Sequence, residues 1–252
     1  MLPDFDACLA EMRAVFVLIE NSVPAPVQAS RGDDFVFRCQ ERTLEQALVM
    51  KLARAVSDLG AAMVLLEHGY VQEVGTLQRC IDDFNEEIKF LALARLTDTE
   101  TEVHQRFLDG FYSEVIDDLD DVVGSLTKKR PGVNRREIRE ATEVSLAEMS
   151  RRSGTDLQPG SELNRAISTL YNSFAHAGSP QVLEMYGGNP PRFHLNGMLG
   201  TRRIAEHRRD IVNQFYRTSA TIGLVALATG NGEAFARAKA LSTSLQPYAC
   251  SS

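Results

Sequence analysis

The chain has 252 residues, 44% of them hydrophobic, and a formal net charge of −7. The hydrophobic share is sufficient for a folded core, but no uncharged apolar run reaches the roughly 18 residues that a bilayer-spanning helix needs. The acidic balance argues against a general nucleic-acid-binding protein. The four cysteines lack the paired spacing of a zinc site or a disulfide framework: Cys8, Cys39, Cys80 and Cys250. We therefore expect a cytoplasmic protein with no membrane span, no metal site and no cofactor.

The N-terminal part, residues 1–40, is predicted to be one helix followed by a loop. Asp4 is a suitable N-cap for a helix that extends to about Ile19. Residues 27–40 include the alternating Phe35-Val36-Phe37, so they are expected to form a loop or a brief extended segment.

The clearest pattern follows at residue 44. Apolar side chains recur there at every third or fourth position, at Leu44, Leu48, Leu52, Ala55, Leu59, Met63 and Leu66. After Gly69 the same spacing returns, at Val71, Val74, Leu77, Ile81, Phe84, Ile88 and Leu91. Two long helices joined by so short a loop must lie antiparallel. Residues 44–96 are therefore predicted to be a helical hairpin at the centre of an all-α bundle.

The remaining chain also favours helices, separated by short loops. We expect them at residues 102–119, 131–152, 161–176, 195–228 and 233–242, with a loop at 181–193. No strand pattern is strong enough for a sheet, and no linker divides the chain. Residues 1–252 are therefore expected to form a single all-α domain, with its core at 41–229 and a C-terminal helix and tail at 230–252.

Charge is strongly segregated along the sequence. Residues 98–121 contain nine acids and one arginine, residues 128–152 contain eight basic residues and four glutamates, and residues 202–217 contain five arginines and two acids. These stretches either pair with one another, within the fold or across a dimer, or bind a protein partner or phosphate.

The segment Tyr171-Asn172-Ser-Phe-Ala-His176 ends a predicted helix just before a Gly-Ser-Pro break. An imidazole at a helix C-terminus lies near the negative end of the helix dipole, which favours its protonated form. His176 could therefore simply cap the helix. Alternatively, Tyr171 and Asn172 lie close enough on the helix to form with it a polar site for a small group or a phosphate.

The second long helix carries Arg79, followed by Asp82, Asp83, Glu86 and Glu87. Carboxylates one turn apart can bind a divalent metal, but metal sites in bundles usually include a Glu-x-x-His histidine, which neither long helix has. A salt-linked or solvated face is the alternative that we favour. Arg202 and His207 form an isolated arginine-x4-histidine spacing further on.

The hairpin with Arg79 and Asp83 four residues later, followed by Tyr171-Asn172-x3-His176, resembles a bacterial all-helical protein family allied to the HEPN group, over about residues 40–225. In this resemblance Asn172 and His176 match the second and last positions of an Arg-x4–6-His motif. Tyr171 stands in place of the arginine, and Asp83 in place of a glutamate. Many HEPN proteins are metal-independent ribonucleases with a dimeric active site, so the resemblance implies a HEPN-like fold, a homodimer, and RNA or a nucleotide as ligand.

Two functions follow as hypotheses. The first is a non-catalytic interaction or nucleotide- or RNA-binding module in a defence or toxin–antitoxin context, which we favour because the arginine of the motif is missing. The second is a metal-independent endoribonuclease in which His176 acts as general acid or base. Its phosphate would then lie near Tyr171, Asn172 and an arginine, for which Arg79 and Arg165 are the candidates. Whether the protein is an enzyme is left open by the sequence.

Overall fold

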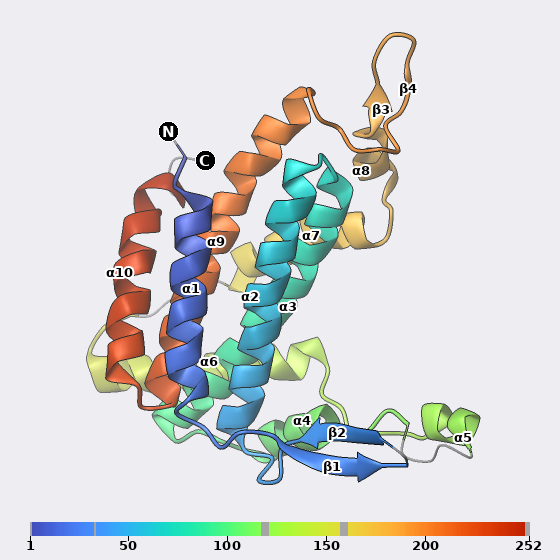
Figure 1. Ribbon diagram of the computed structural model, residues 1–252. Helices are drawn as coiled ribbons and strands as arrows, with labels where there is room; N and C mark the ends of the chain where they lie inside the picture. The colour runs from blue at the N-terminus through green and yellow to red at the C-terminus, as the bar shows by residue number, and fades with distance from the viewer. Residues whose placement is uncertain (1, 33, 117–120, 157–160, 250–252) are drawn as a thin grey trace.

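The computed structural model describes residues 2–32, 34–116, 121–156 and 161–249. This part of the chain is mostly helical, as predicted, with ten α-helices and two small antiparallel hairpins (Figure 1). The two β-hairpins differ from the prediction, which expected no β-sheet. None of the described helices has both the length and the apolar composition that crossing a bilayer requires.

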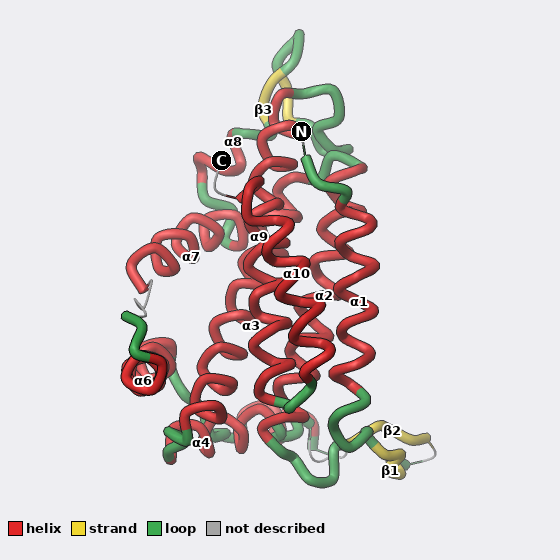
Figure 2. The backbone as a smooth tube through the Cα atoms, turned by 90° about the vertical axis from the view of Figure 1, so that its left-hand side faces the viewer, coloured by secondary structure: helices red, strands yellow, loops and turns green. Residues whose placement is uncertain are grey.

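Five long helices form the body of the molecule: α1 (Phe5–Glu20), α2 (Leu44–Glu67), α3 (Val71–Thr97), α9 (Arg202–Ala228) and α10 (Gly232–Ala249). They run alongside one another in both views (Figures 1 and 2). Residues 68–70 join α2 to α3, and α3 packs against both α2 and α9. Every one of these helices contributes a fully buried side chain to a common core, for example Met12, Leu52, Ile88, Phe215 and Leu245.

Side-chain caps fix where the first two helices begin. Asp4 Oδ1 accepts a hydrogen bond of 3.0 Å from the Ala7 N–H, which is the expected cap of α1. At α2, Gln46 N–H donates to Thr43 Oγ1 and Thr43 N–H donates to Gln46 Oε1, both at 3.1 Å. This capping box satisfies two backbone donors that a helix start would otherwise leave unpaired.

Several helices have bounds other than those expected. α6 (Arg135–Ser153) begins after Asn134, whose side chain caps it, and not at residue 131. α9 begins later than residue 195, because Gly197 and Gly200 have φ values of 88° and 80°, in the left-handed region that an α-helix cannot include. α4 (Glu102–Phe111) ends before residue 119, and α10 continues past residue 242.

The turn between α2 and α3 anchors the loop that leads into α9. Met198 N–H donates to the Gly69 carbonyl oxygen at 2.8 Å. Gly69 has φ +84°, and a Cβ there would lie 2.6 Å from the Met198 backbone nitrogen. Only glycine permits both this conformation and this approach. The contact fixes the end of the bundle at which α8 (Ser179–Leu183), β3 (Tyr186–Gly187) and β4 (Arg192–Phe193) lie (Figure 1).

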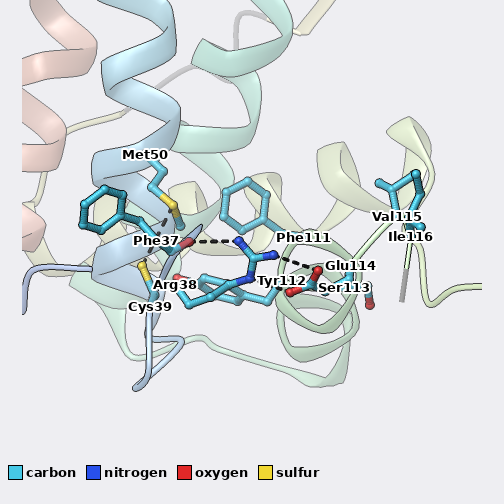
Figure 3. Close-up of a pocket in the computed structure, with 10 residues that line it drawn as sticks. All are labelled: Phe37, Arg38, Cys39, Met50, Phe111, Tyr112, Ser113, Glu114, Val115 and Ile116. Carbon is cyan, nitrogen blue, oxygen red and sulfur yellow. Dashed lines mark hydrogen bonds and ion pairs between the residues drawn. The ribbon is translucent and has the colours of Figure 1, made fainter. Parts of the chain in front are cut away.

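At the opposite end, residues 27–40 form a hairpin of β1 (Val27–Arg31) and β2 (Asp34–Arg38), with Ala29 opposite Val36. Beside it lies a cleft of about 430 Å³, whose lining includes Phe37, Met50, Phe111 and Tyr112 (Figure 3). The Arg38 guanidinium and Glu114 form an ion pair at its edge. α5 (Val122–Thr127) follows in the chain. Residues 117–120 of the acidic stretch are outside the described residues.

The acids of α3 pair with basic side chains inside the fold. Arg135 on α6 lies 2.8 Å from Asp83, 3.4 Å from Glu86 and 3.1 Å from Glu87. Arg139 contacts Glu86 at 2.8 Å, and Lys51 on α2 contacts Glu87 at 2.5 Å. These acids therefore form a salt-linked face, the alternative that the sequence favoured over a metal site. The basic stretch at residues 128–152 therefore pairs chiefly with acids of α3. One ion pair, between Arg152 and Asp98, joins this basic stretch to the acidic stretch at residues 98–121.

Candidate functional site

The residues singled out by sequence lie on three helices: α3, α7 (Ser161–Ala175) and α9. α7 packs against α3 at Gly75, where a Cβ would lie 2.4 Å from Cγ of Phe174. The Phe174 ring therefore occupies the space that any larger residue at position 75 would fill. This close approach brings the segment Tyr171–Phe174 against the first third of α3, at Gly75, Gln78 and Arg79.

Arg79 is held by two partners. Its Nε donates to Asn172 Oδ1 at 3.2 Å, and its guanidinium forms an ion pair with Asp83 one turn further along α3. Asp83 in turn contacts Arg135 at 2.8 Å. The positive charge of Arg79 is thus balanced within the protein, and its planar donor edge is partly occupied.

Tyr171 contributes its hydroxyl to the same contact region. Gln78 Nε2 donates to this hydroxyl at 3.2 Å. Burial raises the pKa of Tyr171 above its ordinary value, and the nearby Asp82 adds to the rise. The phenol is therefore protonated at neutral pH, so it can donate a hydrogen bond but cannot act as a base.

His207 on α9 is buried beneath α7. Its ring lies edge-on to Phe174, with 5.9 Å between ring centroids, and its Nε2 is 3.7 Å from Oε2 of Glu184. Arg203 lies 4.0 Å from the same glutamate. Glu184 thus links the segment after α8 to the first turns of α9.

His176 lies apart from these contacts. It follows the last residue of α7, its N–H donates to the Asn172 carbonyl oxygen at 3.1 Å, and its side chain is exposed. Among the described residues, its imidazole has no hydrogen bond or ion pair. Ala177 follows with φ 51°, which turns the chain out of the helix.

The structure therefore brings together Arg79, Asp83, Tyr171 and Asn172, with His207 on the other side of Phe174. Arg202 lies outside this group, because its side chain is 89% exposed and pairs with Glu206 at 2.8 Å. Arg165 is on α7, but its side chain lies outside the described residues.

A second set of polar residues was not identified from the sequence. Between α3 and α9, Arg217 Nη2 lies 2.8 Å from Oδ1 of Asp82 in an ion pair. Burial raises the pKa of Asp82, although Arg217 acts in the opposite direction. Both side-chain polar atoms of Asn85 are buried without a hydrogen-bond partner in the described structure, and Gln214 lies close enough to Asp82 to lower the pKa of that carboxyl. The sequence signal was Gln214 and Thr218, polar residues that lie one turn apart between the apolar Ile211 and Ile222.

The contacts between α3 and α7 hold two helices together and do not present a reactive group. Arg79 is neutralised and Tyr171 is protonated, while Asp82 is buried beneath them. Among the described residues no group of three or more His, Cys, Asp or Glu side chains is arranged to bind a metal ion.

Exposed aromatic rings and exposed arginines lie together in one segment, residues 176–209, here called the α7–α9 end. Tyr186 and Phe193 form an edge-to-face pair across the β3–β4 hairpin, 4.9 Å between ring centroids, and are 49% and 45% exposed. Exposed arginines without a salt bridge to the described residues lie in the same segment, at Arg192, Arg208 and Arg209.

Searches against protein-family models, curated protein sequences and solved structures found no significant match to this chain.

Proposed function

We propose that this protein is a non-catalytic RNA-binding module with a HEPN-like helical core at residues 41–229, and that it binds single-stranded RNA at the α7–α9 end. The observation that carries the proposal is the exposed Tyr186–Phe193 ring pair, with Arg192 next to Phe193 on β4 and with the exposed Arg208 and Arg209 on α9, none of which has a salt bridge among the described residues. Single-stranded RNA is bound by this combination, because bases stack on exposed rings and phosphates attract unpaired guanidinium groups.

The local charge around the proposed site supports RNA binding, although the net charge of the whole chain is −7. Residues 181–210 contain five arginines and three acids. Two of these acids already have basic partners within the protein. Glu184 contacts Arg203 and His207, and Glu206 contacts Arg202. The third acid, Asp210, interacts with His207 and Arg209. Arg192 and Arg208 remain for phosphate, and a local basic surface can bind RNA on a protein of net negative charge.

The absence of catalysis is part of the proposal. An endoribonuclease site needs a base or acid beside a cation that stabilises charge on the phosphate. Arg79, which donates to Asn172, is paired with Asp83, and the His176 imidazole contacts no charged group among the described residues. Cleavage by His176 is therefore the alternative that the experiment must separate from binding.

The test is the fluorescence anisotropy of a labelled single-stranded RNA of about 12 nucleotides, a length within the usual site sizes, titrated with the protein in EDTA. We expect saturable binding that weakens as salt is raised, because bound phosphates release counterions. The double variant Tyr186→Ala/Phe193→Ala should bind about tenfold more weakly or worse, since each stacked base contributes about 1–3 kcal/mol.

A second variant separates charge from stacking. Arg208→Glu/Arg209→Glu should lower both the affinity and the steepness of the salt dependence, whereas Lys239→Glu on α10, an exposed cation distant in the chain, should do neither. Binding that is unaffected by either double variant would contradict the proposal. Gel analysis of the same samples checks for cleavage: RNA shortened by the wild type but intact with His176→Ala would replace the proposal by the ribonuclease alternative.

A further inference from the structure

α7 contributes little to the shared core of the molecule. Each of the five long helices supplies fully buried side chains to that core, whereas none of the described side chains of α7, at residue 166 and residues 169–175, is buried. Leu170 and Asn172 are exposed, and Tyr171 and Phe174 are half-buried. In Figure 2 α7 lies beside α3, outside the group of long helices. Segments with so few buried apolar contacts open at a lower free-energy cost than the rest of a protein.

The described side chains of α7 hold it to the long helices over a short stretch. The Phe174 ring occupies the space that Gly75 leaves on α3, and it meets His207 of α9 edge-on. Gln78 and Arg79 each donate one hydrogen bond of 3.2 Å to α7, which is the long end of the usual range. These contacts all involve residues 171–174, about one turn of a helix of 15 residues. They can therefore be lost together.

The surface beneath α7 is polar. Gln78 and Asp82 on α3 and Gln214 on α9 are each at most 6% exposed. Arg217 pairs with Asp82 at 2.8 Å, and Gln214 lies close to the same carboxyl. Both Asp82 and Arg217 lie near enough to the Tyr171 hydroxyl to influence its pKa. Gln78, Asp82, Gln214 and Arg217 are here called the polar floor.

Burial of the polar floor costs free energy that water would return. Buried polar groups lose their hydrogen bonds to water, and the contacts made inside the protein only partly replace them. Asp82 shows this cost, because burial raises its pKa above 3.8 and so opposes its ionisation. Removal of α7 would hydrate polar side chains here, whereas removal of a long helix would expose the apolar core. The composition of the floor thus lowers the cost of separating α7.

We propose that α7 is a cover that detaches from α3 and α9 while the five long helices stay folded, and that its opening exposes the polar floor. Phe174 keeps the cover closed, because its ring supplies the apolar contact with both helices. In the open state Arg79 also loses Asn172 as a partner, so more of its guanidinium becomes accessible. The proposed RNA-binding residues lie outside α7, so this proposal is independent of RNA binding.

The first test is amide hydrogen exchange of the full wild-type chain, measured by mass spectrometry at a series of urea concentrations below the unfolding transition. A detached helix of 15 residues is marginally stable in water, so its amides exchange when the cover opens. We expect the amides of α7 to exchange about tenfold faster, or more, than those of α3 and α9. Their exchange should depend little on urea, because a local opening exposes little new surface. Protection of α7 equal to that of α3, with the same dependence on urea, would overturn the proposal.

The second test measures access to the polar floor itself. In a chain whose four cysteines are replaced by alanine, Gln78→Cys and Ser219→Cys are compared by their rates of reaction with a water-soluble aromatic disulfide. Positions 78 and 219 are buried alike, at 1% and 0% exposure. Ser219 is the matched control, because it lies one turn before Gly223, on the side of α9 that faces α10.

We expect position 78 to react about tenfold faster, or more, than position 219. Phe174→Ala should accelerate the reaction at position 78 by about tenfold or more and leave position 219 unchanged, since it removes the ring that closes the cover. Circular dichroism checks that each variant is folded. Equal rates at the two positions, or a rate at position 78 that Phe174→Ala does not change, would contradict the proposal. Exchange of the α7 amides without reaction at position 78 would do so too, because a helix that frays in place does not uncover the floor.

Discussion

The position of α7 depends on Gly75, because glycine has no side chain and so leaves room for the Phe174 ring. The Phe174 ring lies where a Cβ would project, with three ring carbons within 2.9 Å of that position. Ring and backbone on a packed helix can move little, because interiors have few voids.

We therefore predict that Gly75→Ala destabilises the protein by about 1–3 kcal/mol, the usual cost of overpacking. The measurement is urea unfolding followed by circular dichroism. The matched control is Gly223→Ala, on α9, where a Cβ would have only ordinary contacts, the nearest at 3.7 Å. In a Phe174→Ala background the cost of Gly75→Ala should fall to near zero. An equal cost in both backgrounds would show that Phe174 is not the obstacle.

Asp82 is the buried acid whose ionisation is opposed by its surroundings. Its pKa is raised above 3.8, chiefly by burial. The folded state then binds a proton more tightly than the unfolded state does. Because the folded state holds more protons between pH 3.8 and its own raised pKa, the free energy of unfolding falls as pH rises through that window.

We predict that Asp82→Asn removes this part of the pH dependence. Relative to the wild type, the variant should gain stability as pH rises from about 4 toward neutrality, because a neutral amide pays no cost of ionisation. Chemical unfolding at a series of pH values measures the difference. A constant difference between the two proteins across the series would show that Asp82 has an ordinary pKa in the folded state.

At the scale of elements, α6 is attached to α3 by charge. Arg135 contacts three carboxylates of α3 and its side chain is only 33% exposed. Its neighbour Arg136 is 83% exposed and, within the part of the chain that the structure describes, forms a salt bridge only with Glu140 on its own helix. Two adjacent arginines on one helix therefore provide a direct comparison.

We expect Arg135→Ala to destabilise the protein by about 1–2 kcal/mol, since it leaves three partly buried acids without one shared cation and a single exposed pair contributes only about 0.2–1 kcal/mol. Arg136→Ala should change stability by less than about 0.5 kcal/mol. Thermal unfolding at low and high salt is the measurement, and the loss with Arg135→Ala should shrink at high salt. Equal effects of the two substitutions would contradict the assigned role of Arg135.

At the scale of the whole molecule, the two ends and one side of the bundle present different chemistry. The α7–α9 end exposes aromatic rings and arginines that have no salt bridge among the described residues, and one side of α1 and α2 exposes small side chains such as Ala10 and Ala61. The β1–β2 end contains a cleft with aromatic walls (Figure 3). A helical body of buried apolar side chains keeps these surfaces apart, so each surface can be tested by its own variants.

The sequence by itself determined the helical class and where many helices lie, because apolar residues at every third or fourth position, such as those from Leu44 to Leu66, can form a continuous buried face only in a helix. It also identified Asp4 as a cap, since capping is decided by residues close together in the chain. Only the tertiary structure decided which polar residues meet. Arg79 and Asn172 are 93 residues apart, and their contact depends on Gly75 admitting Phe174. The exposure of His176 and the burial of Asp82 likewise follow from how helices pack, which no local pattern encodes.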